Sequence, residues 1–407
     1  MKRLIFLNRF FFPDHSATSQ ILSDLAFYLA ECGSDVHIVT SRQLYEDPKA
    51  RLPARETVRG VTIHRVFSTQ FGRTSLAGRG LDYLSFYAAT MLKLVKLAGA
   101  GDVIIAKTDP PLIAVPAMWA ARIRRATLVN WLQDIYPEIA IEMGVPFAKG
   151  PVGRFLCWLR DASLKTAVAN VAVGEQMAVR LESRDVSVVR IHVIPNWCDD
   201  EEIIPVTPAD NPLRQAWDLQ NKFVIGYSGN LGRGHEFDTL LAASERFRDN
   251  PRLTFILIGG GHRFEELKRR VKAKGLDPMY RFFPYQDRKL LKYSLSVPDL
   301  HWISLQPTLS DLLFPSKFYG VAAAGRPILA LTGKQGEIAR LVRDHDCGFA
   351  IEPGDITATA DAIALLAKDG ARCQKMGLNA RAMLDSQFTR RRALQQWKNL
   401  LDHLRAG

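Results

Sequence analysis

Cysteine is scarce in this sequence, and the cysteines that occur are not grouped. The chain has 407 residues and only five cysteines, and no two of them form a C-x-x-C pair (Cys32, Cys157, Cys198, Cys347 and Cys373). The odd number and wide spacing predict neither a zinc site nor a disulfide framework, and they fit a reducing cytoplasm.

A long hydrophobic run is also lacking. No stretch of about 18 uncharged apolar residues occurs, and the best candidate, residues 83–100, contains Lys93 and Lys96. The apolar run at the N-terminus is too short for a signal peptide and is interrupted by Arg9. We therefore expect no membrane-spanning segment, and residues 83–100 either pack on a sheet or lie on a membrane surface.

Acidic residues are outnumbered. The chain has 42 Asp and Glu against 54 Lys and Arg, a formal charge of +12, and about half of this excess lies in residues 368–407. This excess favours an acidic partner, which is a nucleic acid, a phosphorylated substrate or an anionic membrane. The terminal cluster is otherwise explained as a solvated helix face. A hydrophobic fraction of 47% is that of a globular protein, and the length indicates two domains.

Short apolar runs alternate with helical patterns along the whole chain, which predicts α/β domains with parallel sheets. The expected strands are Leu4–Leu7, Val36–Thr40, Val61–Phe67, Val103–Ala106, Leu128–Leu132, Val171–Val173, Arg190–Ile194, Phe223–Tyr227, Leu253–Ile258, Leu300–Ser304, Ile328–Leu331 and Phe349–Ile351. Helical spacing occurs at Ile21–Ala30, Leu81–Ala98, Pro111–Ile123, Pro151–Ala167 and Phe237–Phe247.

A proline-rich segment between Pro195 and Pro212 separates two such series. We therefore predict two doubly wound domains, residues 1–200 and 201–386, and a terminal helix in residues 387–407. Ligands of open parallel sheets bind beyond the carboxyl ends of the strands, so functional residues should lie in the loops that follow strands.

The strongest such loop covers residues 227–235, Tyr-Ser-Gly-Asn-Leu-Gly-Arg-Gly-His. Its glycines allow close approach of the backbone to a ligand, and the N-terminus of a helix follows, which favours a phosphate. Arg233 and His235 add cationic contacts. The spacing matches neither the dinucleotide fingerprint nor the P-loop. The alternative is a tight turn without a ligand, and three glycines with Arg and His favour the phosphate site.

Two further loops follow the same logic. Residues 258–263, Ile-Gly-Gly-Gly-His-Arg, come after the next strand and include Gly260, although a plain turn would look alike. In the segment from Leu313 to Pro327, Pro315 suits the first turn of a helix, and Ser316 and Lys317 follow it. A lysine at the positive end of a helix is unfavourable unless an anion binds there, which favours a diphosphate contact.

The N-terminal half offers weaker candidates. Asp134 and Glu138 follow the strand Leu128–Leu132 and are candidate acid/base groups, and Asp134 is equally well explained as the cap of the next helix. His15 lies in the loop after the first strand, where it is either a substrate contact or a solvated loop histidine.

Taken together, these loops resemble the retaining glycosyltransferases of family 4, which have the GT-B fold of two facing Rossmann-like domains around a cleft. The closest likeness is to the WcaI/WbuB-like branch, which builds capsule, colanic acid and O-antigen. The matching stretches lie in the same order along the chain: Pro13–Leu29, Leu132–Gly144, Ile194–Asp199, Tyr227–Leu241, Pro315–Pro327 and Gly336–Leu341.

The resemblance implies roles for the two domains. The C-terminal domain would bind a nucleoside-diphosphate sugar, such as a UDP- or GDP-sugar, and the N-terminal domain the acceptor. The last helix would return to the N-terminal domain. The sugar would be transferred with retention, without a cofactor or metal. The acceptor would be a saccharide on undecaprenyl diphosphate, which places the enzyme at the inner face of the bacterial cytoplasmic membrane.

The resemblance also implies site residues, and the chain departs from the family pattern at several of them. Gly229 and Asn230 stand where the family has Gly-Arg, His235 where it has a lysine, and Gly320 where the second glutamate of its E-x7-E motif binds ribose. Arg233 and Lys317 would then supply the cations, with Asp134 completing the catalytic set. The donor side would also include Gly232, Gly260, Pro315, Ser316 and Glu337, and the acceptor side His15, Thr18 and Glu138.

Two other functions fit parts of the pattern. Nucleotide-sugar 2-epimerases share the two-domain architecture. They need a group of acidic residues for elimination and re-addition, and the sequence shows no such group. A non-enzymatic binder of anionic surfaces would explain the charge, but no nucleic-acid motif occurs, and the glycines concentrate after strands. We therefore expect no nucleic-acid partner.

Overall fold

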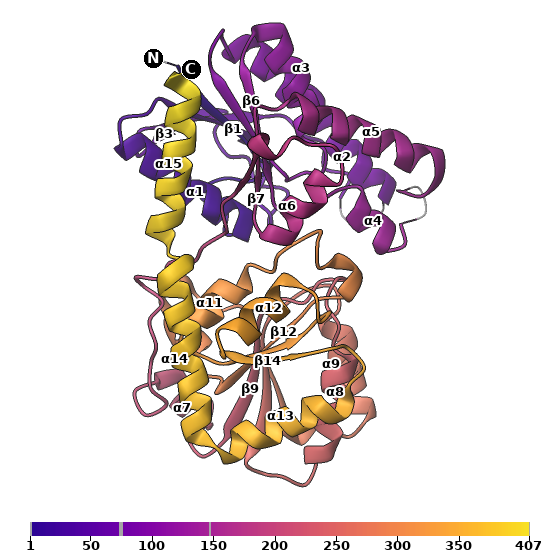
Figure 1. Ribbon diagram of the computed structural model, residues 1–407, viewed down its shortest axis with the longest axis vertical. Helices are drawn as coiled ribbons and strands as arrows, with labels where there is room; N and C mark the ends of the chain where they lie inside the picture. Colours follow the sequence, from indigo (N-terminus) through magenta and orange to yellow (C-terminus); the bar gives the residue numbers. More distant parts are fainter. Residues whose placement is uncertain (1, 73–75, 146–147, 407) are drawn as a thin grey trace. The chain divides into compact units, whose positions relative to one another are not determined.

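The computed structural model describes residues 2–72, 76–145 and 148–406. The chain divides into two compact units. The first unit contains residues 1–195 together with 393–407, and the second contains residues 196–392. The sequence-based boundaries were residues 200 and 386, whereas the divisions in the structure follow residues 195 and 392. Each unit is an α/β layer structure with helices on both faces of one sheet (Figure 1).

The first unit is built on an eight-stranded sheet with the order β3-β4-β2-β1-β5-β6-β7-β8. All neighbouring strands are parallel except β3 and β4. The strands are β1 (Leu4–Leu7), β2 (Val36–Ser41), β3 (Arg55–Val58), β4 (Val61–Val66), β5 (Val103–Lys107), β6 (Thr127–Leu132), β7 (Ala169–Ala172) and β8 (Ile191–Val193).

Helices connect these strands, and the apolar faces of several of them form the core with the sheet. The helices are α1 (Ala17–Glu31), α2 (Leu76–Leu97), α3 (Ala114–Arg124), α4 (Glu138–Glu142), α5 (Gly150–Thr166), α6 (Glu175–Glu182) and a 3-10 turn at Val188–Arg190. Helix α3 lies between α2 and α5 and contacts both. Since α2, α3 and α5 each contact strands of the same sheet, they form one layer.

The end of the chain completes the first unit. Helix α15 (Arg390–Ala406) carries Trp397, which is fully buried and packs on Trp131 of β6 with ring centroids 4.5 Å apart. Two hydrogen bonds join this helix to the α1 region, from Tyr28 Oη to Gln395 Oε1 at 3.2 Å and from Arg405 to Ser34 Oγ at 3.1 Å. Residues far apart in sequence thus share one core.

The second unit has a six-stranded, wholly parallel sheet with the order β11-β10-β9-β12-β13-β14. Its strands are β9 (Phe223–Asn230), β10 (Leu253–Gly260), β11 (Tyr280–Phe283), β12 (Leu300–Ser304), β13 (Ile328–Leu331) and β14 (Gly348–Ile351). Its helices are α7 (Pro212–Ala216), α8 (Asp238–Ser244), α9 (Phe264–Ala273), α10 (Leu291–Ser296), α11 (Lys317–Ala323), α12 (Glu337–Asp344), α13 (Ile356–Lys368) and α14 (Gly370–Gln387), with 3-10 turns at Glu245–Phe247, Asp277–Met279, Arg288–Leu290 and Pro307–Leu309.

Each sheet reverses its strand order once. In the first unit the chain runs outward from β1 to β2 and β4, then returns to place β5 on the other side of β1. In the second unit it runs from β9 to β10 and β11, then places β12 on the other side of β9. Such reversals open a crevice beyond the carboxyl ends of the two central strands, where ligands of these folds bind.

Several sequence-based expectations need correction. Strand β9 continues to Asn230, so Gly229 lies within the sheet and not in the loop after it. The helix expected at Phe237–Phe247 is the short α8 followed by a 3-10 turn. Helix α11 begins at Lys317, so Pro315 precedes the helix and is not in its first turn.

One of the two sequence-based expectations for residues 83–100 was that they lie on a membrane surface. This is wrong for part of the apolar face of the helix. Phe86 and Leu94 of α2 are fully buried in the core of the first unit, and Tyr87 and Val95 pack against that core. Leu84, which belongs to the expected lipid-facing set, is exposed, and so is Leu92. Within the residues that the structure describes, no helix is long and apolar enough to cross a membrane.

A buried ion pair holds the start of the second sheet together. The guanidinium of Arg214 in α7 donates to both carboxylate oxygens of Asp299, at 2.8 and 3.2 Å, and to the carbonyl oxygens of Leu219 and Lys222. Asp299 also accepts a hydrogen bond from the backbone N–H of Val224 at the start of β9. Because Arg214 is almost completely buried, the loss of either partner leaves an uncompensated charge.

We expect Arg214→Ala to lower the free energy of unfolding of the second unit by about 3–5 kcal/mol, the usual cost of breaking a buried pair. Chemical denaturation followed by tryptophan fluorescence measures this change. The matched control is Arg246→Ala, which breaks an exposed pair with Asp361 and should cost at most about 1 kcal/mol. Equal losses in both variants would contradict the role assigned to Arg214.

Candidate functional site

Two glycine-rich loops meet at the carboxyl edge of the second sheet. Strands β9 and β10 remain paired to their last residues, Gly229 opposite Gly259 and Asn230 opposite Gly260. The backbone N–H of Leu231 donates to the Gly260 carbonyl at 2.7 Å, which joins the two loops. The predicted donor-side residues Gly229, Asn230 and Gly260 therefore lie side by side.

The glycines of these loops serve packing as well as ligand access. Gly259 has φ +131°, and a Cβ there would lie 2.3 Å from the carbonyl oxygen of Gly229. A Cβ on Gly229, whose φ is +127°, would lie 3.2 Å from Cε of Lys317. Glycine is thus required for the two loops to touch, and Gly229 leaves room for the side chain of Lys317.

Lys317 reaches the end of β9 from the first residue of α11. Its Nζ lies 2.7 Å from the Tyr227 hydroxyl, 3.3 Å from the Asn230 carbonyl oxygen and 3.1 Å from Nε2 of His235. The Tyr227 hydroxyl itself donates to the Asn230 carbonyl at 2.7 Å. Within the described residues no carboxylate lies within ion-pair distance of Lys317, so its charge has only neutral partners.

The hydrogen bonds of His235 define its tautomer. Nδ1 lies 2.7 Å from the carbonyl oxygen of Ser304, and a carbonyl only accepts, so the proton is on Nδ1. Nε2 then presents a lone pair to the Lys317 ammonium group. The ring is therefore neutral, and it connects the end of β12 with the loop after β9.

The pKa values of both groups reflect this enclosure. Burial lowers the pKa of Lys317 from 10.5 to about 7. Burial and then the charge of Lys317 lower the pKa of His235 to about 3. The physical cause is the same for both, because the charged forms lose water and gain no anion. An incoming anion would supply the missing charge.

The loop after β9 is held by contacts that the sequence did not reveal. The Arg263 guanidinium donates to the His235 carbonyl at 2.7 Å, and the Ser304 hydroxyl accepts from the Glu236 N–H at 3.1 Å. The Gln306 N–H donates to the Gly234 carbonyl at 3.0 Å. Ser304 ends a strand, so the rule that residues at strand ends form the site could have identified it.

The remaining donor-side candidates lie less close to Lys317 and His235. The side chain of Arg233 is exposed, next to the half-buried Gly232. Pro315 and Ser316 precede Lys317 and bring it to the sheet edge, and the Pro315 carbonyl accepts from the Phe318 N–H at 3.1 Å. Gly320 is buried, and a Cβ there would lie 3.3 Å from Leu295 Cδ1, so this position has little room for a longer side chain.

Glu337 is the first residue of α12, in the segment after β13. In the sheet order, β13 is two strands from β9. The residue is 8% exposed, and its charge acts together with burial, the larger cause, to raise the pKa of Tyr319. The structure thus places Glu337 at the same sheet edge as Lys317, beyond the neighbouring strand β12.

The acceptor-side candidates belong to the first unit, where Glu138 is held by arginines. Arg160 donates to both of its carboxylate oxygens, at 2.8 and 2.5 Å, and Arg184 donates at 2.9 Å. These contacts lower the pKa of Glu138 although its burial, the largest single effect, would raise it. With both oxygens occupied by guanidinium groups, the geometry favours a structural role for Glu138 over proton transfer.

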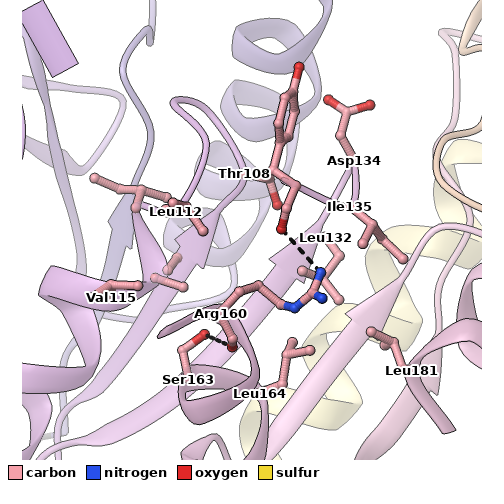
Figure 2. Close-up of a pocket in the computed structure, with 14 residues that line it drawn as sticks. Thr108, Leu112, Val115, Leu132, Asp134, Ile135, Arg160, Ser163, Leu164 and Leu181 are labelled. Atoms are coloured by element: carbon pink, nitrogen blue, oxygen red, sulfur yellow. Dashed lines mark hydrogen bonds between the residues drawn. The ribbon is translucent and has the colours of Figure 1, made fainter. Parts of the chain in front are cut away.

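Asp134 has the opposite environment. It follows β6, and within the described residues its carboxylate makes no hydrogen bond or ion pair. In Figure 2 the carboxyl group points away from Arg160, which instead donates to the Tyr136 carbonyl at 3.1 Å. Burial, and secondly the charge of Asp109, raise the pKa of Asp134 to about 7. It does not cap α4, whose N-cap residue is Pro137.

Residues Lys107 and Asp109, which the sequence analysis did not single out, lie near Asp134. Asp109 follows β5, the central strand at which the first sheet reverses its order, and Thr18 Oγ1 donates to its carboxylate at 3.3 Å. Lys107 is fully buried, donates to the Thr18 carbonyl at 3.0 Å and lies over the Trp131 ring. Thr18 therefore sits at the strand reversal of the first unit. His15 is exposed nearby in sequence, and its carbonyl accepts from Gln20.

A cavity beneath Asp134 is too small for a sugar. Its volume is about 30 Å³, and it is lined mainly by apolar side chains, among them Leu112, Leu132 and Leu164 (Figure 2). Such a space holds a water molecule at most. Asp134 is among the residues that line this space, which has no room for a sugar ring.

Comparison with known proteins is consistent across both units. A family model described as "Glycosyl transferase 4-like domain" matches residues 17–197, and one described as "Glycosyl transferases group 1" matches residues 210–383. The probable glycosyltransferase WbjE of Pseudomonas aeruginosa is 26% identical over 71% of this chain and 72% of its own. The putative colanic acid biosynthesis glycosyl transferase WcaI of Escherichia coli is 25% identical over 85% and 87%.

Solved structures share the fold over the whole chain. HepE of Anabaena, solved in complex with UDP, has a TM-score of 0.71 at 18% identity and covers 98% of this chain and 100% of its own. Sucrose-phosphate synthase of Thermosynechococcus elongatus has a TM-score of 0.78 at 17% identity, with 100% of both chains covered. The fold is therefore GT-B, and the chain belongs to the family 4 glycosyltransferases, in the branch that includes WcaI.

Proposed function

We propose that this glycosyltransferase moves a sugar, with retention of configuration, from a UDP- or GDP-sugar to a lipid-linked saccharide in cell-surface polysaccharide biosynthesis. The observation that carries the proposal is the ammonium group of Lys317. It lies at the strand reversal of the second unit with three neutral partners, and the described residues place no carboxylate beside it. A diphosphate is the anion that a nucleotide-sugar transferase must hold there.

The relatives support the finer parts of the proposal. WcaI is named for colanic acid biosynthesis, and a transferase of Halothermothrix orenii, 22% identical over 67% of this chain and 68% of its own, is named for a pyrophosphoryl-undecaprenol acceptor. HepE was solved with UDP-glucose as well as UDP. We infer from these names a UDP-sugar donor and a polyprenyl-diphosphate acceptor at the inner face of the cytoplasmic membrane.

In the proposed reaction, negative charge develops on the leaving diphosphate as the bond to the sugar breaks. Protonated Lys317 stabilises this charge, and exposed Arg233 adds a second cation once donor is bound. His235 stays neutral and holds the Lys317 ammonium in place through Nε2. Since positively charged side chains neutralise the diphosphate in this scheme, no metal or cofactor is expected to take part.

On the acceptor side we propose that Asp134 receives the hydroxyl group that attacks the sugar. Its carboxylate has no protein partner within the described residues, so it can accept a hydrogen bond from a sugar hydroxyl. Thr18, beside Asp109, and exposed His15 are proposed to contact the acceptor saccharide. The hydroxyl proton passes to the leaving diphosphate on the same face, which accounts for retention.

Replacing the central cation tests the donor site. We expect Lys317→Met to weaken UDP binding about 10- to 100-fold, the range of a charged hydrogen bond worth about 1.5–3 kcal/mol. Isothermal titration calorimetry with UDP and with GDP measures the effect and identifies the base. The control is Lys334→Met, an exposed lysine of the same unit, which should bind like wild type. Equal affinity of Lys317→Met and wild type would refute the assignment.

The lowered pKa of Lys317 predicts a pH dependence of donor binding. The free protein loses the Lys317 charge as pH rises through about 7. Above that pH the lysine must take up a proton to bind the diphosphate, so affinity should fall about tenfold per pH unit. Titrations between pH 6 and 9 in buffers of different ionisation enthalpy measure this proton uptake. The slope attributable to Lys317 is absent in Lys317→Met; an identical slope in that variant would exclude the linkage.

The raised pKa of Asp134 predicts that this residue destabilises the fold at neutral pH. Its folded pKa of about 7 exceeds the ordinary aspartate pKa of 3.8, so stability falls as pH rises between these values. Asp134→Asn should therefore raise the melting temperature at pH 8 by more than at pH 5, while turnover drops. Asp185→Asn, which changes an exposed carboxylate, is the control. A stable Asp134→Asn variant with normal turnover would remove Asp134 from the mechanism.

A further inference from the structure

The outer side of α3 and α5 in the first unit carries an unusual set of exposed apolar side chains. Trp119 and Ile123 of α3 are 46% and 57% exposed, and Val152, Phe155 and Trp158 of α5 are 53%, 56% and 63% exposed. We call these five residues the α3–α5 face. The two helices contact each other along the same layer. Single exposed hydrophobic residues are common, but a group that includes two tryptophans indicates a binding surface.

The pattern along α5 shows that this exposure is built into the helix. Its buried positions are Gly153, Arg160, Ser163 and Leu164, which face the sheet. Val152, Phe155 and Trp158 lie on the outer side, and the rings of Phe155 and Trp158 stack with centroids 5.8 Å apart. The helix thus buries an arginine and a serine inward and presents its aromatic residues to the outside.

The helices that form and flank the face contain few acidic residues. Helices α2, α3 and α5 contain only two acidic residues, Asp82 and Asp161. Asp82 is buried and accepts hydrogen bonds from Thr69 and Phe71, and Asp161 is paired with Arg160 at 2.6 Å. Neither offers a free negative charge to the surface.

Cations frame the same side chains. Exposed basic residues stand beside the face at the end of α3, Arg122, Arg124 and Arg125, and at the start of α5, Lys149 and Arg154. A surface hollow of about 500 Å³ next to α5 is lined by the cations Lys149, Arg154 and Arg184 and by Trp158, with Asp161 as its one acidic side chain. Aromatic residues with a basic rim match the interface of an anionic bilayer, where indole rings sit at headgroup level and cations meet lipid phosphates.

We propose that the α3–α5 face is the surface with which this protein rests on an anionic lipid bilayer. The proposal deepens the proposed function, because a lipid-linked acceptor has to be met at a membrane. Phe155, Trp158 and Trp119 enter the headgroup region, and Arg154 and Lys149 contact phosphates. The apolar area is small and the charge contribution is large, so binding is peripheral, reversible and dependent on anionic lipid.

Vesicle sedimentation tests the proposal with the full-length protein. Wild type should bind mixed phosphatidylcholine and phosphatidylglycerol vesicles, and bind pure phosphatidylcholine vesicles far less. Phe155→Ser/Trp158→Ser should lower the partition coefficient on mixed vesicles at least about tenfold, given the apolar area removed. The matched control, Val188→Ser/Val189→Ser, removes two valines of the same unit that are 64% and 81% exposed and should bind like wild type.

Two further variants keep the test decisive if the first one folds poorly. Trp119→Ser/Ile123→Ser should also lower binding, and Lys149→Glu/Arg154→Glu should abolish the preference for phosphatidylglycerol. Unchanged melting temperatures and unchanged UDP binding confirm that the fold and the donor site are intact. Failure of wild type to bind mixed vesicles, or equal losses in the valine control, overturns the proposal. Because UDP binding is measured separately, failure here is distinguishable from failure of the donor site.

Discussion

Both candidate sites depend on one constraint of parallel sheets, the reversal of strand order. A connection between two parallel strands must cross over from one end of the sheet to the other. Where two successive connections run to opposite sides of a strand, neither covers the carboxyl ends of the strands between them, and a crevice is left open there. In the second unit the reversal lies between β9 and β12, and His235 bridges these strands by accepting from Lys317 and donating to Ser304. In the first unit it lies between β1 and β5, where Thr18 and Asp109 meet.

Arg214 and Lys317 are two cations of the second unit that differ in their partners. Arg214 has a carboxylate and two carbonyl groups, so its charge is compensated and its role is to fix α7 to the sheet. Lys317 has a hydroxyl, a carbonyl and a neutral imidazole, which orient the ammonium but leave its charge uncompensated. The contrast separates a structural cation from one prepared for an anion, and it does so within one sheet.

The sequence predicted the α/β class and most strands, because buried parallel strands are short apolar runs between helical patterns. The prediction missed two edge strands, β3 and β11. Strand β3 is half-exposed, with Arg55 and Glu56 in place of an apolar run, and β11 is a four-residue strand interrupted by Arg281. The loops after β9 and β10 were singled out by their glycines, and the structure brings them together with Lys317. Tyr227 and Ser304 were given no role, because they are the last residues of the predicted strands 223–227 and 300–304 and were counted with the sheet. Asp134 and Glu138 looked alike in sequence, and only the approach of Arg160 and Arg184 from distant segments separates them.

The route of the last helix has a consequence for how the protein is made. Trp397 and Leu401 of α15 are fully buried in the first unit, and Trp397 packs on Trp131. The ribosome delivers residues 1–195 first, but the helix that covers this part of the sheet emerges only after residues 196–392. All of residues 196–392 are synthesised in between, so the second unit has its complete chain earlier. The unit that is translated first is therefore the one whose core closes last.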